Sequence, residues 1–443
     1  MAGRTLSPWV MVLTMLAVWI GTGSILGNAE ETYRTGMAAL IIPLGTFIGM
    51  ILLSLIATRI RNIEAFSVPE IIGSRFGSIA RFLAVIALII AYMVIVSYQF
   101  NAGGAVIEVI SEGTVSKQTA TFIAAIFIIT YTMLAGLKSL AGMDIITGSV
   151  ITITLLITFP VLLFKAGGFD GMQNAYNIQN RPSHMQFWGI YSPVQLINYL
   201  LPTFLLVMGD ANQYQRIFAS RNARGAKQAV TVLIFAALAI ELLIIASAWV
   251  AGSITPDQQE GKYILIYTAR EHLPTCLGIL FMITVVGIII STADSFLLVP
   301  ATTFINDVYS TYINPKADQK KIIFISRLLV LLFGVIAYLV THAFAETTGF
   351  FKKALYAYTI YGSAVTPTLV AALFWKRATK AGAISSIMTG IIVTLIWSEA
   401  DFIRNNLPAS IADLDAVLPA ITLSVICLVV VSLFTSPKTV RSN

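Results

Sequence analysis

The stretch GIIISTADSF, residues 287–296, places a polar face on a helix that is otherwise apolar enough to lie in a membrane. Ser291 is followed at i+3 and i+4 by Asp294 and Ser295, so three side chains with oxygen atoms share one face, next to the hydroxyl of Thr292. Such groups are costly in hydrocarbon unless they bind one another or a cation. The stretch therefore predicts an ion site inside a membrane domain.

The composition of the whole chain agrees with this location. Hydrophobic residues make up 57% of the 443 residues, charged residues make up 11%, and the mean hydropathy is +0.84. These values lie outside the range of soluble domains. Apolar runs of roughly 20 residues recur about twelve times, and runs of this length predict membrane helices rather than barrel strands. They lie at 7–28, 37–58, 82–110, 119–136, 144–165, 193–212, 228–252, 274–300, 322–343, 351–375, 382–400 and 416–435.

The net charge of +7 does not indicate a nucleic-acid partner, because the basic residues are spread over alternate loops. Most of the 28 lysines and arginines fall on one side if the N-terminus is cytoplasmic, as the positive-inside rule requires. The opposite loops are comparatively acidic and include Glu30 and Glu31. We therefore expect a multi-pass protein of the cell membrane with both termini cytoplasmic. No soluble segment interrupts the runs, so residues 1–443 are expected to form a single transmembrane domain, with no obligatory protein partner indicated.

Two of the apolar runs carry residues that break helices. The first reads AVWIGTGSILG over residues 17–27, and its three glycines weaken a helix at membrane depth. Unwound backbone is tolerated there only where it lines a cavity or is buried in protein; close helix packing is the alternative use of such glycines. Pro202 interrupts the sixth run. Breaks in the first and sixth helices are typical of two inverted five-helix repeats.

Four motifs lie in order along almost the whole chain: YTMLAGLK at 131–138 with Asp144, GDANQYQRIF at 209–218, STADS at 291–295 with NDVY at 306–309, and FWKRATKAGA at 374–383. Together they resemble the sodium:solute symporter family. The resemblance implies an all-α integral membrane bundle of the LeuT type with about 12 transmembrane helices. It further implies inverted repeats at about 7–166 and 193–375, with additional helices at about 380–435.

The resemblance also assigns ion sites. The principal sodium site would use the backbone carbonyls of Ala17, Ile20 and Ile288 with the hydroxyls of Ser291 and Thr292; unwound carbonyls and a hydroxyl face are oxygen ligands that suit a hard cation. A possible second sodium site would use Asp144, Ser291, Asp294 and Ser295. Either two carboxylates then lie near one ion, or one of them has a proton or salt-bridge role. The alternative for each serine is a hydroxyl bonded back to its own helix.

The solute cavity is less well defined by the sequence. The first run looks more like the choline-transporter branch of the family than the sugar or proline branches, so the Trp19 ring could face a quaternary ammonium group; helix packing is the alternative. The runs expected around the cavity carry no lysine or arginine at mid-depth, which argues against a strongly anionic solute. Glu241 lies in the middle of the seventh run without an assigned role. The expected cavity residues are Trp19, Ser24, Gln99, Thr203, Phe204 and Tyr358.

These observations favour a sodium-coupled secondary active symporter that imports a small neutral, zwitterionic or cationic organic solute by alternating access, with the sodium ion as its cofactor. A proton-coupled transporter and a membrane sensor of the same fold are the alternatives. An enzyme is disfavoured. The sequence places no nucleophile next to a base at mid-depth, and the three histidines lack the spacing of metal ligands. Members of the family usually carry one more helix before the first core helix, joined by an Ala-Gly-Arg-like link. This sequence opens at Met1-Ala2-Gly3-Arg4, and the core repeats do not require that helix.

Overall fold

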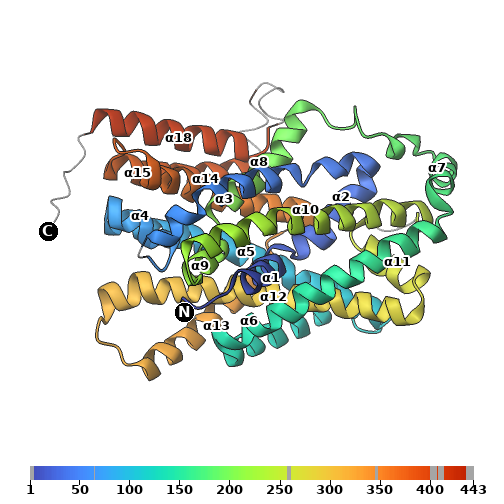
Figure 1. Ribbon diagram of the computed structural model, residues 1–443, viewed down its shortest axis with the longest axis horizontal. Helices are drawn as coiled ribbons and strands as arrows, with labels where there is room; N and C mark the ends of the chain where they lie inside the picture. The colour runs from blue at the N-terminus through green and yellow to red at the C-terminus, as the bar shows by residue number, and fades with distance from the viewer. Residues whose placement is uncertain are drawn as a thin grey trace.

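The computed structural model describes residues 4–63, 65–256, 261–344, 348–399, 407 and 414–435, which form an elongated bundle of helices (Figure 1). An isolated bridge pairs Leu6 with Ser220. The helices are α1 (Pro8–Trp19), η1 (Gly23–Gly27), α2 (Asn28–Thr35), η2 (Gly36–Ile41), α3 (Leu44–Asn62), α4 (Val68–Phe76), α5 (Ser78–Ile110), α6 (Lys117–Lys165), α7 (Gly168–Ile178), η3 (Pro182–Met185), α8 (Pro193–Gly209), α9 (Ala211–Ala219), α10 (Ala223–Ile254), α11 (Ile264–His272), α12 (Thr275–Phe304), η5 (Ile305–Ile313), α13 (Gln319–Thr341), α14 (Phe350–Phe374), α15 (Lys380–Glu399) and α18 (Val417–Phe434).

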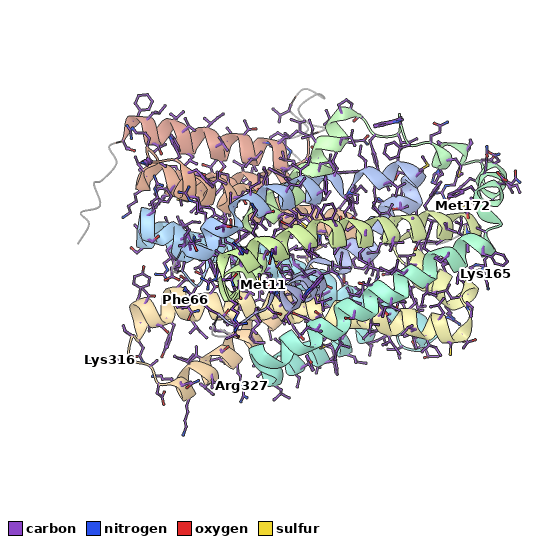
Figure 2. The ribbon with its side chains drawn as sticks, viewed as in Figure 1. Met11, Phe66, Lys165, Met172, Lys316 and Arg327 are labelled. Atoms are coloured by element: carbon purple, nitrogen blue, oxygen red, sulfur yellow. The ribbon has the colours of Figure 1, made fainter. Side chains whose placement is uncertain are left out.

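Eleven of the described helical segments are long and apolar enough to cross a membrane, or up to 12 if the bent pair at the N-terminus counts as one span. This number agrees with the twelve or so apolar runs of the sequence. Helix α6 carries two of the spans, Lys117–Leu134 and Gly142–Lys165. Figure 2 places Lys316 at one end of the bundle and Lys165 and Met172 at the other. The connection that carries Lys316 and the turn from α6 to α7 therefore lie at opposite ends of the molecule.

The first span is broken where its glycines predicted. Helix α1 ends at Trp19, a π-helix follows at Gly23–Gly27, and the segments on either side of the break differ in direction by 54°. The span also runs further than expected, to Ile41 instead of residue 28. Glu30 and Glu31 consequently lie in α2 with 1% and 4% of their surface exposed. Their predicted place in an outer loop is therefore wrong.

The sixth span breaks at a different residue from the one predicted. Pro202 lies inside α8, and the helical backbone stops at Asp210, whose φ is −59° and ψ is 112°. Asp210 uses its carboxylate to accept hydrogen bonds from the amide of Asn212 at 3.1 Å and from the Tyr92 hydroxyl at 2.6 Å, so it also caps α9. A proline is tolerated in a membrane helix when neighbouring groups satisfy the freed carbonyl. The break is therefore set by an aspartate cap.

Helix α12 occupies a central position, because it contacts α5, α6, α1 and α13. Helix α1 packs in turn on α6, α10 and α12. This arrangement brings the break in the first span against the polar face of residues 291–295. Helices α15 and α18 pack on one another and on α14, outside this centre.

Candidate functional site

The break in the first span frees two of the carbonyl groups that were predicted to bind sodium. In an unbroken helix the amide of Gly21 would bond to the carbonyl of Ala17, and that of Ser24 to the carbonyl of Ile20. Here the Gly21 amide donates to Trp19 at 3.0 Å and the Ser24 amide donates to Gly21 at 3.1 Å. The carbonyls of Ala17 and Ile20 thus lose their helical donors while both residues are fully buried.

Thr292 of α12 supplies a third oxygen at the same place. Its Oγ1 is buried and has no hydrogen-bond partner among the described residues. A methyl group built on Gly21 would lie 2.9 Å from Thr292 Cγ2 and 3.1 Å from Thr292 Oγ1, so the break and the threonine are in close approach. A free hydroxyl next to free carbonyls in a buried position is the donor set that a desolvated sodium ion requires.

The other two predicted ligands of this site are already engaged. Ile288 is fully buried within the continuous helix α12, so its carbonyl has only its second lone pair to offer. Ser291 donates its hydroxyl hydrogen to Asp144 Oδ1 at 2.6 Å. Since a hydroxyl oxygen keeps lone pairs when it donates, Ser291 can still accept a cation, and its bond to a carboxylate increases the negative charge on its oxygen.

Of the four residues of the possible second sodium site, Asp144 contacts Ser291 directly and Ser295 through an arginine, whereas Asp294 is bonded to Thr132. Asp144 Oδ2 lies 3.1 Å from Nη2 of Arg216, and that nitrogen lies 3.5 Å from the hydroxyl of Ser295. The guanidinium of Arg216 therefore stands against Asp144 and Ser295, where the second ion was expected. Asp294 accepts a hydrogen bond from Thr132 through Oδ1, and its Oδ2 is buried without a partner among the described residues.

Arg216 is a residue that the sequence reasoning missed as part of this site. The positive-inside rule alone would place it at the cytoplasmic surface, although its side chain is only 14% exposed. The signal that could have revealed it is the position of Arg216 in the motif at 209–218, less than two turns after the Asp210 break. A basic side chain that close to a broken helix can reach back into the bundle.

A small cavity lies beside the break, on the side of α2, α3, α10 and α14. Its volume is about 20 Å³, which is room for about one water molecule. Four of the six residues expected at the solute cavity, Trp19, Ser24, Thr203 and Tyr358, line it together with Asn28, Thr46 and Glu241, which the sequence did not assign to a cavity. Glu241, for which the sequence indicates no role, therefore lies at the wall of the candidate solute cavity.

Two predicted cavity residues lie elsewhere. The carbonyl of Gln99 accepts a hydrogen bond from the Thr22 hydroxyl, so Gln99 holds the broken helix rather than lining this cavity. Phe204 also does not line it, and its backbone carbonyl faces Gly49 of α3. The position of a residue within an apolar run does not determine whether its side of the helix faces the cavity.

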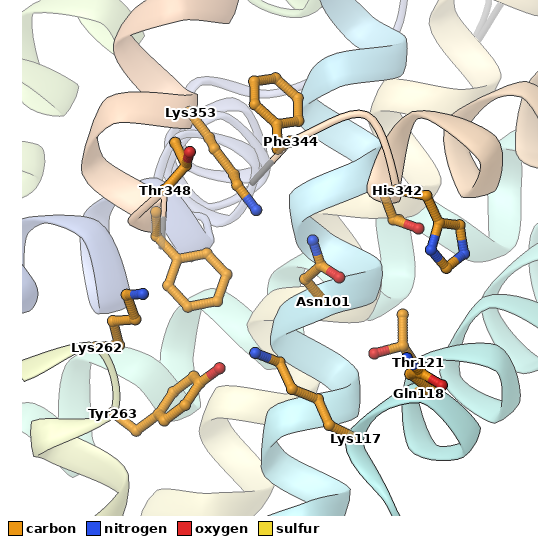
Figure 3. A pocket seen from close by; sticks show the side chains of 12 residues that line it. Asn101, Lys117, Gln118, Thr121, Lys262, Tyr263, His342, Phe344, Thr348 and Lys353 are labelled. Atoms are coloured by element: carbon orange, nitrogen blue, oxygen red, sulfur yellow. The ribbon is translucent and has the colours of Figure 1, made fainter. Parts of the chain in front are cut away.

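A second cavity, of about 190 Å³, opens at the end of the bundle formed by the starts of α6 and α14 and the end of α13. Figure 3 shows the amines of Lys117, Lys262 and Lys353 directed into it from different elements, with Asn101 on α5 between them. The Lys353 amine also lies 5.2 Å from the centre of the Phe344 ring. This basic cavity is on the predicted outer side.

Glu30 joins the second half of the broken span to α14 near that cavity. Its Oε2 accepts a hydrogen bond from the amide of Phe350 at 2.8 Å, and its Oε1 is 2.9 Å from Nη2 of Arg34. Phe350 is the first residue of α14, so Glu30 satisfies one of the free donors of that helix end. The contact holds α2 against α14.

Known proteins resemble this chain in sequence and in fold. The sequence model of a family described as "Sodium:solute symporter family" matches residues 1–390. The osmoregulated proline transporter OpuE of Bacillus subtilis is 24% identical, over 98% of this chain and 89% of its own. The sodium/proline symporter of Escherichia coli is 22% identical, over 90% of this chain and 82% of its own.

Solved structures of transporters superpose on almost the whole chain. A Na⁺-coupled sialic acid symporter in a substrate-bound outward-open state gives a TM-score of 0.78 at 16% identity, covering 98% of this chain and 91% of the other. Mhp1, a nucleobase-cation-symport-1 family transporter in a closed conformation, gives 0.65 at 11% identity, covering 98% and 94%. The predicted LeuT-type fold is confirmed by these likenesses, whereas the choline-branch resemblance of the first run stays a prediction.

Proposed function

The chain belongs to the sodium:solute symporter family, and we propose that it is a sodium-coupled secondary active symporter that imports a small neutral, zwitterionic or cationic organic solute by alternating access. The family consists of multi-pass membrane transporters rather than enzymes, and its membership implies the use of sodium ions. Its curated relatives include proline transporters, so L-proline is the first solute to test.

One observation carries the proposal: the free hydroxyl of Thr292 lies against the break that frees the carbonyls of Ala17 and Ile20. We assign the principal sodium ion to these oxygens, with Ser291 and Ile288 completing the set. The ion would join α1 to α12, which belong to the first and second of the proposed repeats, at 7–166 and 193–375. Sodium binding would thus favour one relative placement of the two repeats, which is what coupling by alternating access requires.

We further propose that one sodium ion accompanies each solute molecule. The ion pair of Asp144 with Arg216 supplies a fixed positive charge where a second sodium ion would otherwise neutralise the carboxylate. At about 100 mV one entering sodium ion gains roughly 2.3 kcal/mol, and a tenfold sodium gradient adds about 1.4 kcal/mol. One ion can therefore concentrate a neutral solute some 500-fold.

Uptake into proteoliposomes tests the proposal. The purified protein is reconstituted, and accumulation of radiolabelled L-proline and of other small amino-acid and amine solutes is followed with an inward sodium gradient, with potassium in its place, and with a proton gradient alone. We expect accumulation only with sodium. Full accumulation driven by protons in the absence of sodium would contradict sodium coupling.

Proton coupling remains the second candidate, and one observation favours it. Asp294 has an oxygen that is buried without a partner among the described residues, which suits a carboxyl group that carries a proton. If protons drive transport, Asp294→Asn should abolish accumulation under a proton gradient. If sodium drives transport, the same variant should keep its sodium dependence.

The orientation of the chain is also a proposal. We place both termini in the cytoplasm because the basic loops lie on that side under the positive-inside rule. The basic cavity around Lys117 and Lys353 would then open to the outside.

A further inference from the structure

We propose that Glu241 binds a cationic nitrogen of the transported solute, and thereby restricts the substrates to ammonium compounds, either organic cations or zwitterions such as amino acids. The inference deepens the proposed function and rests on it. It starts from the position of a carboxyl group that is 3% exposed, halfway along α10, at the wall of the cavity beside the broken span.

The hydrogen bonds of Glu241 orient its carboxyl group as an acceptor. The indole Nε1 of Trp19 donates to Glu241 Oε1 at 2.8 Å, and the hydroxyl of Thr46 is a second side-chain partner. Both partners are neutral groups, so they orient the carboxylate without neutralising its charge. Trp19 and Thr46 come from the first span and from α3, which fixes Glu241 relative to the break.

The cavity contains no balancing positive charge. Among the described residues that line it, Glu241 is the one that carries a formal charge, and the others are aromatic, aliphatic, hydroxyl or amide side chains and a glycine. A carboxylate in a dry site is costly unless a cation accompanies it. The lysines of the neighbouring outer cavity line a different space, so the missing cation would have to arrive with the solute.

The remaining walls suit an ammonium group. Trp19, Phe351 and Tyr358 present three aromatic side chains to the cavity, and the faces of such rings attract cations. Carboxylate on one side and rings on the others form a site in which an ammonium group gains both a charge partner and ring contacts. An uncharged solute of the same shape would leave the carboxylate unpaired.

The cavity is too small for any such solute in this conformation. A volume of about 20 Å³ holds about one water molecule, so the solute enters when the surrounding helices separate. The backbone at Gly23 and the hydroxyl of Tyr358 approach closely on one side of the cavity. A methyl group added at Gly23 would lie only 2.8 Å from that hydroxyl. The carboxyl group keeps its neutral partners until the solute arrives.

Pairs of solutes that differ only in charge test the inference. Choline is paired with 3,3-dimethylbutan-1-ol, in which carbon replaces the charged nitrogen, and L-proline is paired with tetrahydrofuran-2-carboxylate, in which oxygen replaces the ring nitrogen. Glycine betaine and its carbon isostere 3,3-dimethylbutanoate form a third pair. Binding to the purified protein in saturating sodium is measured as the solute concentration that gives half of the maximal rise in Tm.

Three variants accompany the wild type. Glu241→Gln removes the charge and keeps an acceptor for the Trp19 indole, and Glu241→Asp keeps the charge at a shorter reach. Glu112→Gln is the matched control, because its side chain is 72% exposed and it pairs with Arg270 away from the cavity. The rise in Tm caused by sodium alone reports whether each variant is folded and retains the ion site.

We expect at least one charged solute to bind the wild type, its uncharged partner to bind at least tenfold more weakly, and Glu241→Gln to lose about tenfold or more in affinity for the charged member. Glu112→Gln should match the wild type. The inference is wrong if no charged member binds better than its partner, or if Glu241→Gln binds it equally well. Failure of sodium itself to raise the Tm of the wild type would instead contradict the sodium symport on which the inference rests.

Discussion

Replacing Thr292 with valine should weaken sodium binding and leave the sodium-free protein at least as stable as before. Valine keeps the branched shape and removes the buried hydroxyl, which has no partner among the described residues. A bond between a charged group and a neutral oxygen contributes about 1.5–3 kcal/mol. The concentration of sodium that gives half-saturation should therefore rise about 10- to 150-fold.

The two effects have opposite signs because the hydroxyl is useful only when the ion is present. Without sodium it is a buried polar group left unpaired, which costs about 1–3 kcal/mol. Its removal should therefore keep or raise the Tm measured in potassium chloride. A purely structural role for Thr292 would instead lower the Tm in sodium and in potassium alike.

Thr303→Val is the matched control for this measurement. Thr303 lies on the same helix, is 1% exposed, and also has a buried hydroxyl without a partner among the described residues. Both variants are titrated with sodium at constant ionic strength while Tm is recorded. An unchanged half-saturating concentration in Thr292→Val, or an equal change in Thr303→Val, would refute the assignment of the ion to the break.

Three further predictions concern other parts of the site and the orientation. Gly21→Ala should raise the half-saturating sodium concentration about tenfold, because the added methyl group would displace Thr292; Gly142→Ala, which has nothing within 4 Å, is its control. Asp144→Asn should leave the charge moved per zwitterionic solute at one, as in the wild type, in proteoliposome current measurements and destabilise the fold by about 3–5 kcal/mol, since Arg216 loses its partner; a wild-type value of two that falls to one in the variant would reveal a second coupled ion. Cys276, which is exposed at the start of α12, should react with a membrane-impermeant maleimide added outside intact cells and lose this labelling in Cys276→Ser; labelling only after permeabilisation would reverse the proposed orientation.

The spans and the first break could be predicted from the sequence because both follow from local properties. Apolar length determines whether a helix can cross a membrane, and the glycines at 21, 23 and 27 weaken one helix at a definite depth. The sixth break was misplaced for a related reason. Pro202 carries the stronger local signal, whereas the bond from Tyr92 that helps to hold Asp210 spans 118 residues of sequence.

The partners of the charged residues could not be predicted, because they depend on which faces meet. Arg216 lies 72 residues from Asp144, and Trp19 lies 222 residues from Glu241. The sequence showed that Glu241 was unusual and that Trp19 was near a break, without showing that they touch. Gln99 and Phe204 illustrate the same gap. Helix α8 lines the cavity through Thr203 and not through its neighbour Phe204, and α5, which carries Gln99, contributes no lining residue.

The hydrogen bond from the first amide of α14 to Glu30 also affects the relative populations of the conformations that the solute-free protein adopts. Swinging α2 away from α14 separates a carboxylate from an amide, a loss of about 1.5–3 kcal/mol before water in the opened gap offsets part of it. Under the proposed orientation and alternating access, each 1.4 kcal/mol that remains would lower the share of outward-open molecules about tenfold. This one carboxylate would then slow uptake at high solute supply and reduce sodium leakage when solute is scarce.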